Sequence, residues 1–539
     1  MKIDTIHLNH NKFVNDYRNQ TDKLKAYFEY NPFMSYKKRL TYLDKSNYQR
    51  KELASILEKM NNNWGSDGTT LKNIERLKSD NAVVVIGGQQ AGLLTGPLYS
   101  VNKVISIIQL AKEQEAELNR PVIPVFWIAG EDHDFDEINH VNMRTKTGLK
   151  KRTIQQIPKF KKSVSQIDLD SNLTKEWLTD IFLELEESTH SKIIYEELLN
   201  ILNESKTYVD FFARLINKLF PKSGLVLVDS ADASLRSIES KYFIKLIEHQ
   251  ESIAKTVSKT IKSLQEQDYS ISLEAEENEG HLFYHDDYGE RILLSRTESG
   301  MWQGKSNHIE FTSEALIQIA EKTPSRLSNN VVTRPLMQEW LFPTLAFVGG
   351  YGEISYWASL KEAFKELNLE MPPVVPRYSL TYIPKKINDV LNKKDIDISQ
   401  AINHGVSDLK LNWLSNQSTP PIELLIDEMN IGIEALHQPI QKVASNLGED
   451  LQHLAETNLA KIIKTTEFLE KRLLREVKYK YKKEINDYDL ITDYLCPDNG
   501  LQERIFNPLF LINNYGFDFI KEITETPLSF KKDHFVIYL

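Results

Sequence analysis

Two short apolar runs on either side of a glycine-rich segment constrain the fold of this chain most. Residues 82–86 read AVVVI, and residues 122–129 read VIPVFWIA. Uninterrupted, β-branched runs of this length are typical of strands that are covered on both faces of a parallel sheet. Between them, apolar residues recur at helical spacing from Val101 to Ala111. The pattern predicts a strand–helix–strand unit of an α/β fold, whose ligands bind at the carboxyl ends of the parallel strands.

The segment between the first run and the helix reads GGQQAGLLTG at residues 87–96 and leads to Pro97, a favoured first helical residue. Glycines let a backbone approach a ligand closely, and free N–H groups at a helix start favour an anion. The segment matches neither the dinucleotide fingerprint nor a P-loop. We predict binding residues here: Gly87, Gly88, Gln89, Gln90, Thr95, Gly96, Tyr99 and Asn102. Lys103 could extend to a phosphate or face solvent, and both alternatives stay open.

Four ionisable residues, Glu131, Asp132, His133 and Asp134, follow the second run directly. Their desolvation is costly unless a cleft hydrates or pairs them, which favours a functional site. The carboxylates would favour protonated His133, as a phosphate-binding cation or, after proton loss, a general base. The alternative is a solvated loop with a helix N-cap. No metal site is predicted, because helical spacing would place His140 about 10 Å from His133.

A third group of polar residues surrounds the expected strand at residues 346–348. Arg334 precedes a proline and suits a carboxylate or phosphate, whereas Glu353 begins an expected helix, where the dipole favours a carboxylate in any case. A further strand is expected over 374–382. The group also contains Asn329, Asn330 and Gln338. The predicted binding residues are Arg334, Gly349, Gly350, Gly352 and Glu353 of this group, with Arg377 and Ser379 near the end of the further strand.

The remaining pattern divides the chain into parts. Residues 1–80 are expected to be helical, strands are expected at 224–229 and 331–332, and a long helix is expected over 231–267. The predicted domains are a parallel-sheet core over 1–384 with insertions at about 144–222 and 269–322, a helical domain over 385–495, and a returning segment over 496–539. Apolar residues from Ile440 to Val477 approach a heptad rhythm. They predict a coiled coil, either an intramolecular hairpin or a seam between two subunits.

Composition excludes several classes of protein. The chain has 539 residues, 41% of them hydrophobic, which favours more than one domain. Its net charge of −10 supplies no overall cationic field for nucleic acid or anionic lipid, and the basic run at 471–483 is better explained as a solvated helix face. No apolar stretch suits a membrane span or a secretion signal, so a cytoplasmic location is expected. Cys496 is the single cysteine, which excludes an intrachain disulfide and a cysteine-rich zinc site.

Taken together, these motifs resemble the BshC family, which adds cysteine in bacillithiol synthesis, over essentially the full length. The motifs are GGQQAG at 87–92, TGPLY at 95–99, NK at 102–103, EDHD at 131–134, VTRP at 332–335, GGYGEISY at 349–356, and LQER at 501–504 with Asn507. The resemblance implies a Rossmann-like catalytic core with inserted connecting segments, a C-terminal helical coiled-coil domain and a homodimer.

The resemblance also implies a reaction: the carboxyl of L-cysteine is joined to the amino group of glucosaminyl-malate, giving bacillithiol in the last step. ATP is expected to activate the carboxylate, with Mg²⁺ only as a counter-ion of the nucleotide. The expected roles are phosphate binding for the glycine segment and Lys103, amine deprotonation for Asp132 or His133, and substrate-carboxylate binding for Arg334. Two alternatives remain: an ATP-independent transferase that uses a pre-activated cysteine donor, and a non-catalytic scaffold held by the coiled coil.

Overall fold

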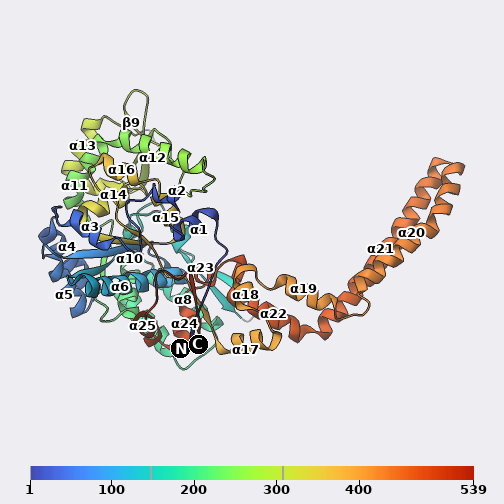
Figure 1. The fold of residues 1–539 in the computed structure, drawn as a ribbon. Coiled ribbons are helices and arrows are strands. Elements are labelled where there is room, and N and C mark those ends of the chain that lie inside the picture. The colour runs from blue at the N-terminus through green and yellow to red at the C-terminus, as the bar shows by residue number, and fades with distance from the viewer. Residues whose placement is uncertain (1, 146–147, 306–308) are drawn as a thin grey trace. The chain divides into compact units, whose positions relative to one another are not determined.

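The computed structural model describes residues 2–145, 148–305 and 309–539 (Figure 1). Their contacts divide into two units. The larger unit holds residues 3–381 and 503–536, and the smaller one holds residue 2, residues 382–502 and residues 537–539.

The larger unit is built on a five-stranded sheet in the order β13-β12-β2-β3-β6. The strands are β13 (Val374–Pro376), β12 (Thr344–Gly349), β2 (Val83–Gln89), β3 (Val122–Ile128) and β6 (Val226–Asp229). Every pairing between them is parallel. β3 is buried along its whole length, as is β2 up to its last residue. The parallel sheet predicted from the apolar runs is therefore confirmed.

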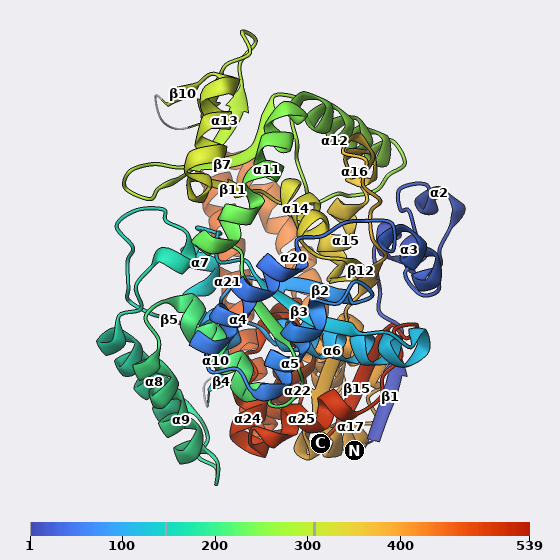
Figure 2. The ribbon, with the colours of Figure 1, turned by 90° about the vertical axis from the view of Figure 1, so that its left-hand side faces the viewer.

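Helix α6 (Leu98–Leu118) joins β2 to β3 and contacts both strands, as Figure 2 shows. Buried side chains recur along it, which explains why the helix lies against the sheet. The first 80 residues are mainly helical, as expected, although they begin with an unpredicted strand. Their elements are β1 (Lys2–Ile6), α1 (Lys12–Arg18), α2 (Asp22–Lys25), α3 (Tyr36–Leu43), α4 (Arg50–Asn63) and α5 (Gly68–Leu77).

Two segments interrupt the sheet. The first begins with α7 (Phe135–Ile138) and the antiparallel hairpin of β4 (His140–Thr145) and β5 (Gly148–Thr153). It continues with α8 (Ser171–Glu184), α9 (Ser191–Glu204) and α10 (Tyr208–Leu219). The hairpin was not predicted. His140 begins a strand, so the helical spacing used to separate it from His133 was wrong.

The second segment forms an antiparallel sheet in the order β10-β9-β8-β7-β11. Its strands are β7 (Glu279–His285), β8 (Arg291–Arg296), β9 (Trp302–Gly304), β10 (Glu310–Phe311) and β11 (Leu327–Asn329), and α13 (Ser313–Lys322) lies before β11. The hairpin expected around residues 286–289 is confirmed by the pairing of β7 with β8.

Four predictions of single elements were wrong. The expected helix over 231–267 is two helices, α11 (Ala233–Glu248) and α12 (Gln250–Gln265), which meet at His249. The expected strand at 331–332 is a turn before α14 (Thr333–Leu341), and Val331 is exposed. The helix expected from Glu353 is α15 (Tyr351–Trp357) and α16 (Lys361–Glu366). The strand expected over 374–382 is β13 and β14 (Leu380–Ile383), which belong to different sheets. The apolar pattern of the sequence alone did not reveal where these helices and strands are interrupted.

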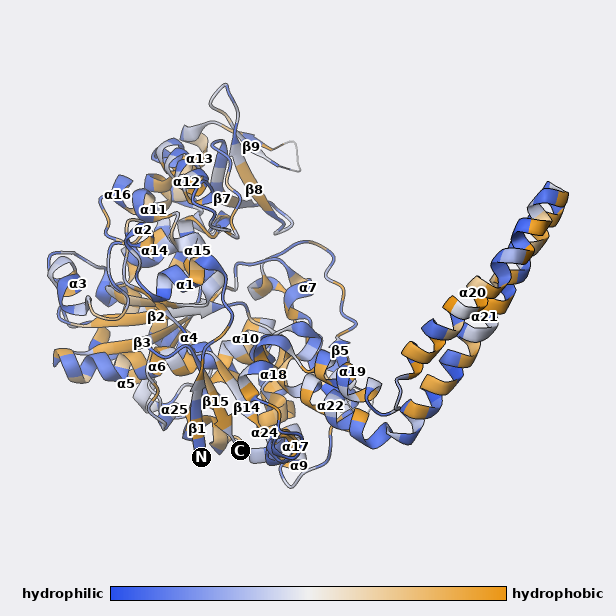
Figure 3. Cartoon of the chain, turned by 45° about the vertical axis from the view of Figure 1, so that its right-hand side comes forward, coloured by the Kyte–Doolittle hydropathy of each residue, from blue (hydrophilic) through white to orange (hydrophobic). Residues whose placement is uncertain are grey.

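The smaller unit is helical. It contains α17 (Lys385–Lys394), α18 (Ile398–His404), α19 (Ser407–Ser415), α20 (Ile422–Leu447), α21 (Glu449–Lys480) and α22 (Lys482–Leu495). Helices α20 and α21 pack against each other as a hairpin that turns at Gly448, where φ is 151° (Figure 3). Polar contacts occur inside the hairpin, such as His437 Nε2 to Asn458 Oδ1 at 3.1 Å. The intramolecular alternative is thus present, and pairing of subunits stays a prediction.

The chain ends with α23 (Gln502–Ile505), α24 (Leu509–Tyr515), α25 (Asp518–Glu525) and β15 (His534–Tyr538). A three-stranded sheet has the order β1-β15-β14. None of the helices formed by the described residues combines the length and apolar character that crossing a membrane requires.

Candidate functional site

The glycine-rich segment and the tetrad of ionisable residues at 131–134 meet at one edge of the parallel sheet. β2 and β3 are neighbours, so their carboxyl ends emerge together. The amide of Ala129 donates to the carbonyl of Gln89 at 2.9 Å, and Gln90 Nε2 donates to Asp132 Oδ2 at 2.7 Å. Gly87, Gly88 and Gln89 are the last residues of β2 rather than loop. The two motifs that the sequence singled out are therefore in direct contact.

Glu131 points into the protein. Its carboxylate forms an ion pair with Arg236 and accepts a hydrogen bond from the backbone of Asn329 at 3.2 Å. Arg236 also binds Glu239 at 2.6 Å. Burial raises the pKa of Glu239 to about 7. Because every one of these side chains is buried, Glu131 holds the end of β3 and is not presented to a ligand.

Asp132 is partly exposed and organises its own turn. Its Oδ1 accepts hydrogen bonds from the amides of His133 at 2.7 Å and Asp134 at 3.4 Å. Burial acts to raise the pKa of Asp132, but the hydrogen bond from Gln90 and the charge of Arg291 outweigh it. The pKa lies below the usual range, and the carboxylate is ionised at neutral pH. Asp134 is exposed and occupies the N-cap of α7 without a side-chain capping bond.

His133 is not held in its protonated form, contrary to the expectation from its acidic neighbours. Burial and then the charge of Arg291 lower its pKa, and together they outweigh Asp132 and Asp134. Arg291 Nη1 lies 3.2 Å from His133 Nδ1. The guanidinium comes from β8, 158 positions along the chain. No local pattern distinguished Arg291 from the other basic residues of its insertion, so sequence reasoning missed it.

Lys103 is fully buried and takes neither of the two positions considered for it. Its Nζ donates to the carbonyl of Gly88 at 2.6 Å, to Gln89 Oε1 at 2.9 Å and to the carboxylate of Glu353. These contacts use all three ammonium hydrogens. Burial lowers the pKa of Lys103, and Glu353 opposes that effect. Glu353 also accepts from the amide of Gly350 at 2.9 Å, so Lys103 links the end of β2 to the start of α15.

The second half of the glycine-rich segment is closed by the C-terminal segment. Leu94, Thr95 and Gly96 have φ angles of 50°, 73° and 69° and are buried. Asn507 Nδ2 donates to the carbonyls of Leu94 and Gly96 at 2.8 and 2.7 Å, and the amide of Leu98 donates to the carbonyl of Phe506 at 2.7 Å. The start of α6 therefore does not offer its first N–H to an anion. Gln89 and Gln90 remain half-exposed.

Three of the predicted binding residues donate hydrogen bonds to one buried carboxylate, that of Glu503. It accepts from Asn102 Nδ2 at 2.7 Å, from Ser379 Oγ at 3.0 Å and from both terminal nitrogens of Arg377 at 2.9 and 2.8 Å. The Arg377 guanidinium lies 5.5 Å from the centre of the Tyr99 ring. Burial acts to raise the pKa of Glu503, but the charge of Arg377 and the hydrogen bonds outweigh burial, so the pKa lies below its usual value. Sequence reasoning noted Glu503 only within the LQER motif.

Arg334 is a half-buried cation whose hydrogen-bond partners are neutral. It donates to Gln338 Oε1 at 3.4 Å and to the Tyr356 hydroxyl, and it lies over the Phe347 ring. Among the described residues, no carboxylate forms an ion pair with it. Gln338 Nε2 and both side-chain amide atoms of Asn329 are buried without a hydrogen-bond partner in the described part of the chain. Ordered water or a polar ligand satisfies such groups, and Gln338 is the one that contacts Arg334.

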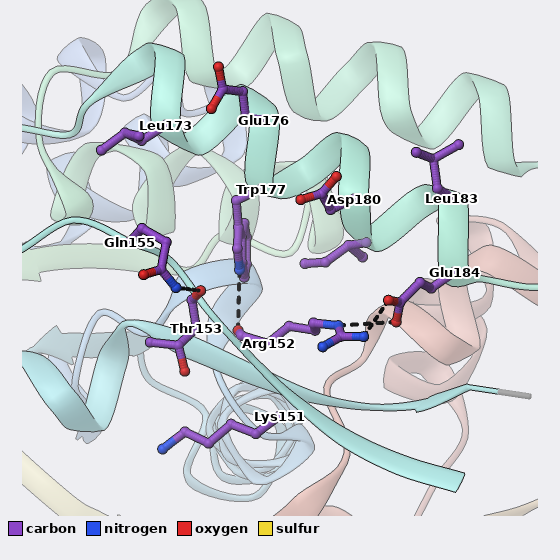
Figure 4. A pocket seen from close by; sticks show the side chains of 11 residues that line it. Lys151, Arg152, Thr153, Gln155, Leu173, Glu176, Trp177, Asp180, Leu183 and Glu184 are labelled. Atoms are coloured by element: carbon purple, nitrogen blue, oxygen red, sulfur yellow. Dashed lines mark hydrogen bonds and ion pairs between the residues drawn. The ribbon is translucent and has the colours of Figure 1, made fainter. Parts of the chain in front are cut away.

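A cavity of about 640 Å³ lies elsewhere, between β5 and α8 (Figure 4). Figure 4 shows Arg152 paired with Glu184. The indole of Trp177 lies above the strand and donates to the carbonyl of Arg152 at 3.2 Å. None of the residues predicted to bind or react lines this cavity. Over the ranges that the structure describes, no three His, Cys, Asp or Glu side chains are grouped as metal ligands.

The Glu503 contacts predict a pH-dependent contribution to stability. A carboxyl whose pKa is lower in the folded than in the unfolded chain stabilises the fold above its unfolded pKa, and the effect is lost as pH falls. We expect Glu503→Gln to lower the free energy of unfolding at pH 7 by about 3 kcal/mol, because Arg377 stays buried without its counter-charge. The difference from the unmodified protein should shrink below pH 4.5, the ordinary value for glutamate.

Urea unfolding at several pH values measures this difference. Glu522→Gln, at an exposed position of α25, is the matched control and should change stability by less than about 0.5 kcal/mol. Equal effects of the two substitutions at pH 7 would contradict the role given to Glu503.

Comparison with known proteins identifies the family. The model of the BshC N-terminal Rossmann-like domain matches residues 1–378, and that of the BshC C-terminal coiled-coil domain matches residues 380–539. A protein from Oceanobacillus iheyensis is 42% identical and covers 98% of each chain; one from Bacillus cytotoxicus is 38% identical over 100% of each chain. A protein from a Geobacillus species is 38% identical over 91% of each chain. All three are named "Putative cysteine ligase BshC".

A solved structure described as "putative arginyl t-RNA synthetase" from Campylobacter jejuni is 9% identical, covers 90% of this chain and 100% of its own, and has a TM-score of 0.22, too low for any argument. The two domain models, by contrast, cover nearly the whole chain, and the relatives match from end to end. The Rossmann-like core and the coiled-coil region predicted from the sequence are confirmed, and the chain belongs to the BshC family of bacillithiol biosynthesis.

Proposed function

We propose that this protein joins the carboxyl group of L-cysteine to the amino group of glucosaminyl-malate by an amide bond, as the last step of bacillithiol synthesis. Membership of the family and the name cysteine ligase given to its relatives support the reaction class. The observation that carries the proposal is the half-buried Arg334, which has no carboxylate partner among the described residues and lies beside the unsatisfied amide of Gln338.

An amine does not displace oxygen from a carboxylate, so the carboxyl group must first be activated. We propose that a cysteine carboxylate oxygen attacks a phosphorus atom of ATP, which releases pyrophosphate or ADP and forms an acyl-adenylate or acyl-phosphate. The amine then attacks the acyl carbon, loses a proton, and expels AMP or phosphate. The half-exposed Gln89 and Gln90 and the cation of Arg334 are the groups suited to the nucleotide or to a substrate anion. Mg²⁺ would accompany the nucleotide as its counter-ion.

Asp132 is the group that we assign to the amine proton. It is ionised at neutral pH, partly exposed, and held at the sheet edge by Gln90. Lys103 has its three hydrogens engaged, so we assign it to holding the strand end rather than to a phosphate. Arg334 would bind a substrate carboxylate, because glucosaminyl-malate and cysteine both carry one.

The purified protein should form the amide when it is supplied with L-cysteine, glucosaminyl-malate and ATP, with ATP consumed only when cysteine is present. Mass spectrometry of the thiol product and release of AMP or ADP measure the two parts. Product formed from an activated cysteine donor without ATP would favour the transferase alternative. Absence of product and of cysteine-dependent ATP consumption would favour the scaffold.

Arg334→Ala should raise the KM of one carboxylate-bearing substrate by about 10- to 100-fold, because a charge-assisted hydrogen bond contributes about 1.5–3 kcal/mol. Steady-state kinetics with each substrate varied in turn identify which one is affected. Arg326→Ala is the control, since Arg326 is paired with Asp287 on the surface of the second insertion. An unchanged KM for both substrates in Arg334→Ala would remove the assignment.

We further propose that the chain forms a homodimer through the α20–α21 hairpin. The hairpin exposes several large apolar side chains to solvent, among them Leu436, Leu447 and Leu454, which are 80%, 69% and 63% exposed. Exposed apolar surface of this kind is typical of an interaction site. Sedimentation should give a mass twice the 62.4 kDa of one chain. The double variant Leu447→Lys, Leu454→Lys should sediment as a monomer, whereas Leu183→Lys, at an exposed site on α8, should not. A dimer that survives the double variant would place the interface elsewhere.

A further inference from the structure

We infer that Arg291 holds His133 in the neutral tautomer that carries its proton on Nε2, so that His133 serves the reaction as a hydrogen-bond donor and not as the base. The part of this inference that concerns the reaction rests on the proposed function. The tautomer itself does not, because it follows from the contacts of the protein alone.

The chemistry of the two side chains determines the tautomer. A guanidinium group has only N–H donors and no acceptor, and it stays charged at any pH at which the protein is folded. Its Nη1 lies 3.2 Å from His133 Nδ1, within hydrogen-bond distance. Nδ1 must therefore accept, and a neutral imidazole that accepts at Nδ1 has its hydrogen on Nε2. Protonation of His133 would put two N–H groups face to face.

The position of Arg291 is strongly determined. Its Nη2 donates to the carbonyl of Asn329 at 2.6 Å, and its Nε donates to Ser328 Oγ at 3.1 Å. The guanidinium carbon lies 3.7 Å from the centre of the Phe283 ring, and the whole residue is 8% exposed. Since β7, β8 and β11 all contribute, the contact with His133 belongs to a built arrangement rather than to a mobile surface arginine.

The other charges around His133 act in both directions. Asp132 and Asp134, on its own loop, favour the imidazolium, whereas Lys161 and Arg291, from the two insertions, disfavour it. His285 on β7 is also close, and burial lowers its pKa to about 3, so it adds no positive charge at neutral pH. The balance leaves His133 neutral where the enzyme would work.

The hydrogen on Nε2 is available to a ligand. The side chain of His133 is 28% exposed, and no described residue accepts a hydrogen bond from Nε2. A neutral donor at the sheet edge, beside the carboxylate of Asp132, suits an oxygen that gains negative charge. In the proposed reaction this is the acyl oxygen of activated cysteine when the amine adds to the acyl carbon. Removal of one such donor typically costs about 100- to 1,000-fold in kcat.

Nitrogen-15 NMR of the full chain labelled at histidine tests the tautomer without any substrate. The His133 signals are assigned by their absence in His133→Gln. We expect the Nε2–H tautomer at pH 7, with a pKa below the usual 6.5. Arg291→Met, which keeps an unbranched side chain without the charge, should raise this pKa and mix the tautomers. Arg291→Lys, which restores a charged donor, should reverse the change, and Arg326→Met should leave the His133 signals unmoved.

Two results would overturn the assignment of the Nε2–H tautomer to His133: a proton on Nδ1 at pH 7, or an imidazolium at that pH. Chemical shifts of His133 that do not respond to Arg291→Met would also overturn it. If Arg291→Met does not fold, the Arg291→Lys protein and the unmodified protein still decide the question.

The role in the reaction is tested by substitution of His133. The side-chain amide of glutamine can donate from about the place of Nε2 but cannot act as a base. We expect His133→Gln to keep kcat within about 10-fold, whereas His133→Ala loses at least about 100-fold. Equal losses in both variants would assign His133 to proton transfer and overturn the donor role. If the unmodified protein makes no amide, the proposed function fails, while the NMR result stands independently.

Discussion

The arrangement at the sheet edge depends on pairing of buried charges. Isolated ions cannot remain in an interior without a large free-energy cost, so each one must find an opposite charge or several hydrogen bonds. The buried Lys103 pairs with the partly exposed Glu353, Arg236 pairs with Glu131 and Glu239, and Arg377 pairs with Glu503. They join the ends of β2 and β3, the start of α15 and the C-terminal segment. Removal of one partner would leave the other charge uncompensated.

These pairings separate the residues that hold the edge from the residues that a ligand can reach. Glu131, Lys103, Asn102 and Ser379 are buried and fully engaged with protein atoms, whereas Gln90, Asp132, His133 and Arg334 remain partly exposed. The chemistry proposed for the protein uses the second group. The first group keeps the second in place, which explains why motifs of both kinds lie close together along the chain.

Much of the fold could be predicted because its signals are local. The AVVVI and VIPVFWIA runs predicted two neighbouring parallel strands, and the strands placed Gln90 beside Asp132. Single turns were harder, because His249 ends one helix and begins another within an amphipathic pattern that continues across it. The tetrad also gave one wrong prediction. Its carboxylates predicted a protonated His133, but the cation that opposes protonation, Arg291, belongs to a distant hairpin and has no local signal in the sequence.

The order of apolar runs, glycines and ionisable residues along the chain was enough to establish the parallel sheet, its edge and the motifs of the family, because strand formation and strand direction follow from local pattern. Only the folded chain decided which charges meet. Arg291 reaches His133 across 158 positions, and Glu503 reaches Arg377 across 126. The protonation state of a site depends on such distant neighbours and on burial. Both are determined only when the insertions and the C-terminal segment pack against the sheet.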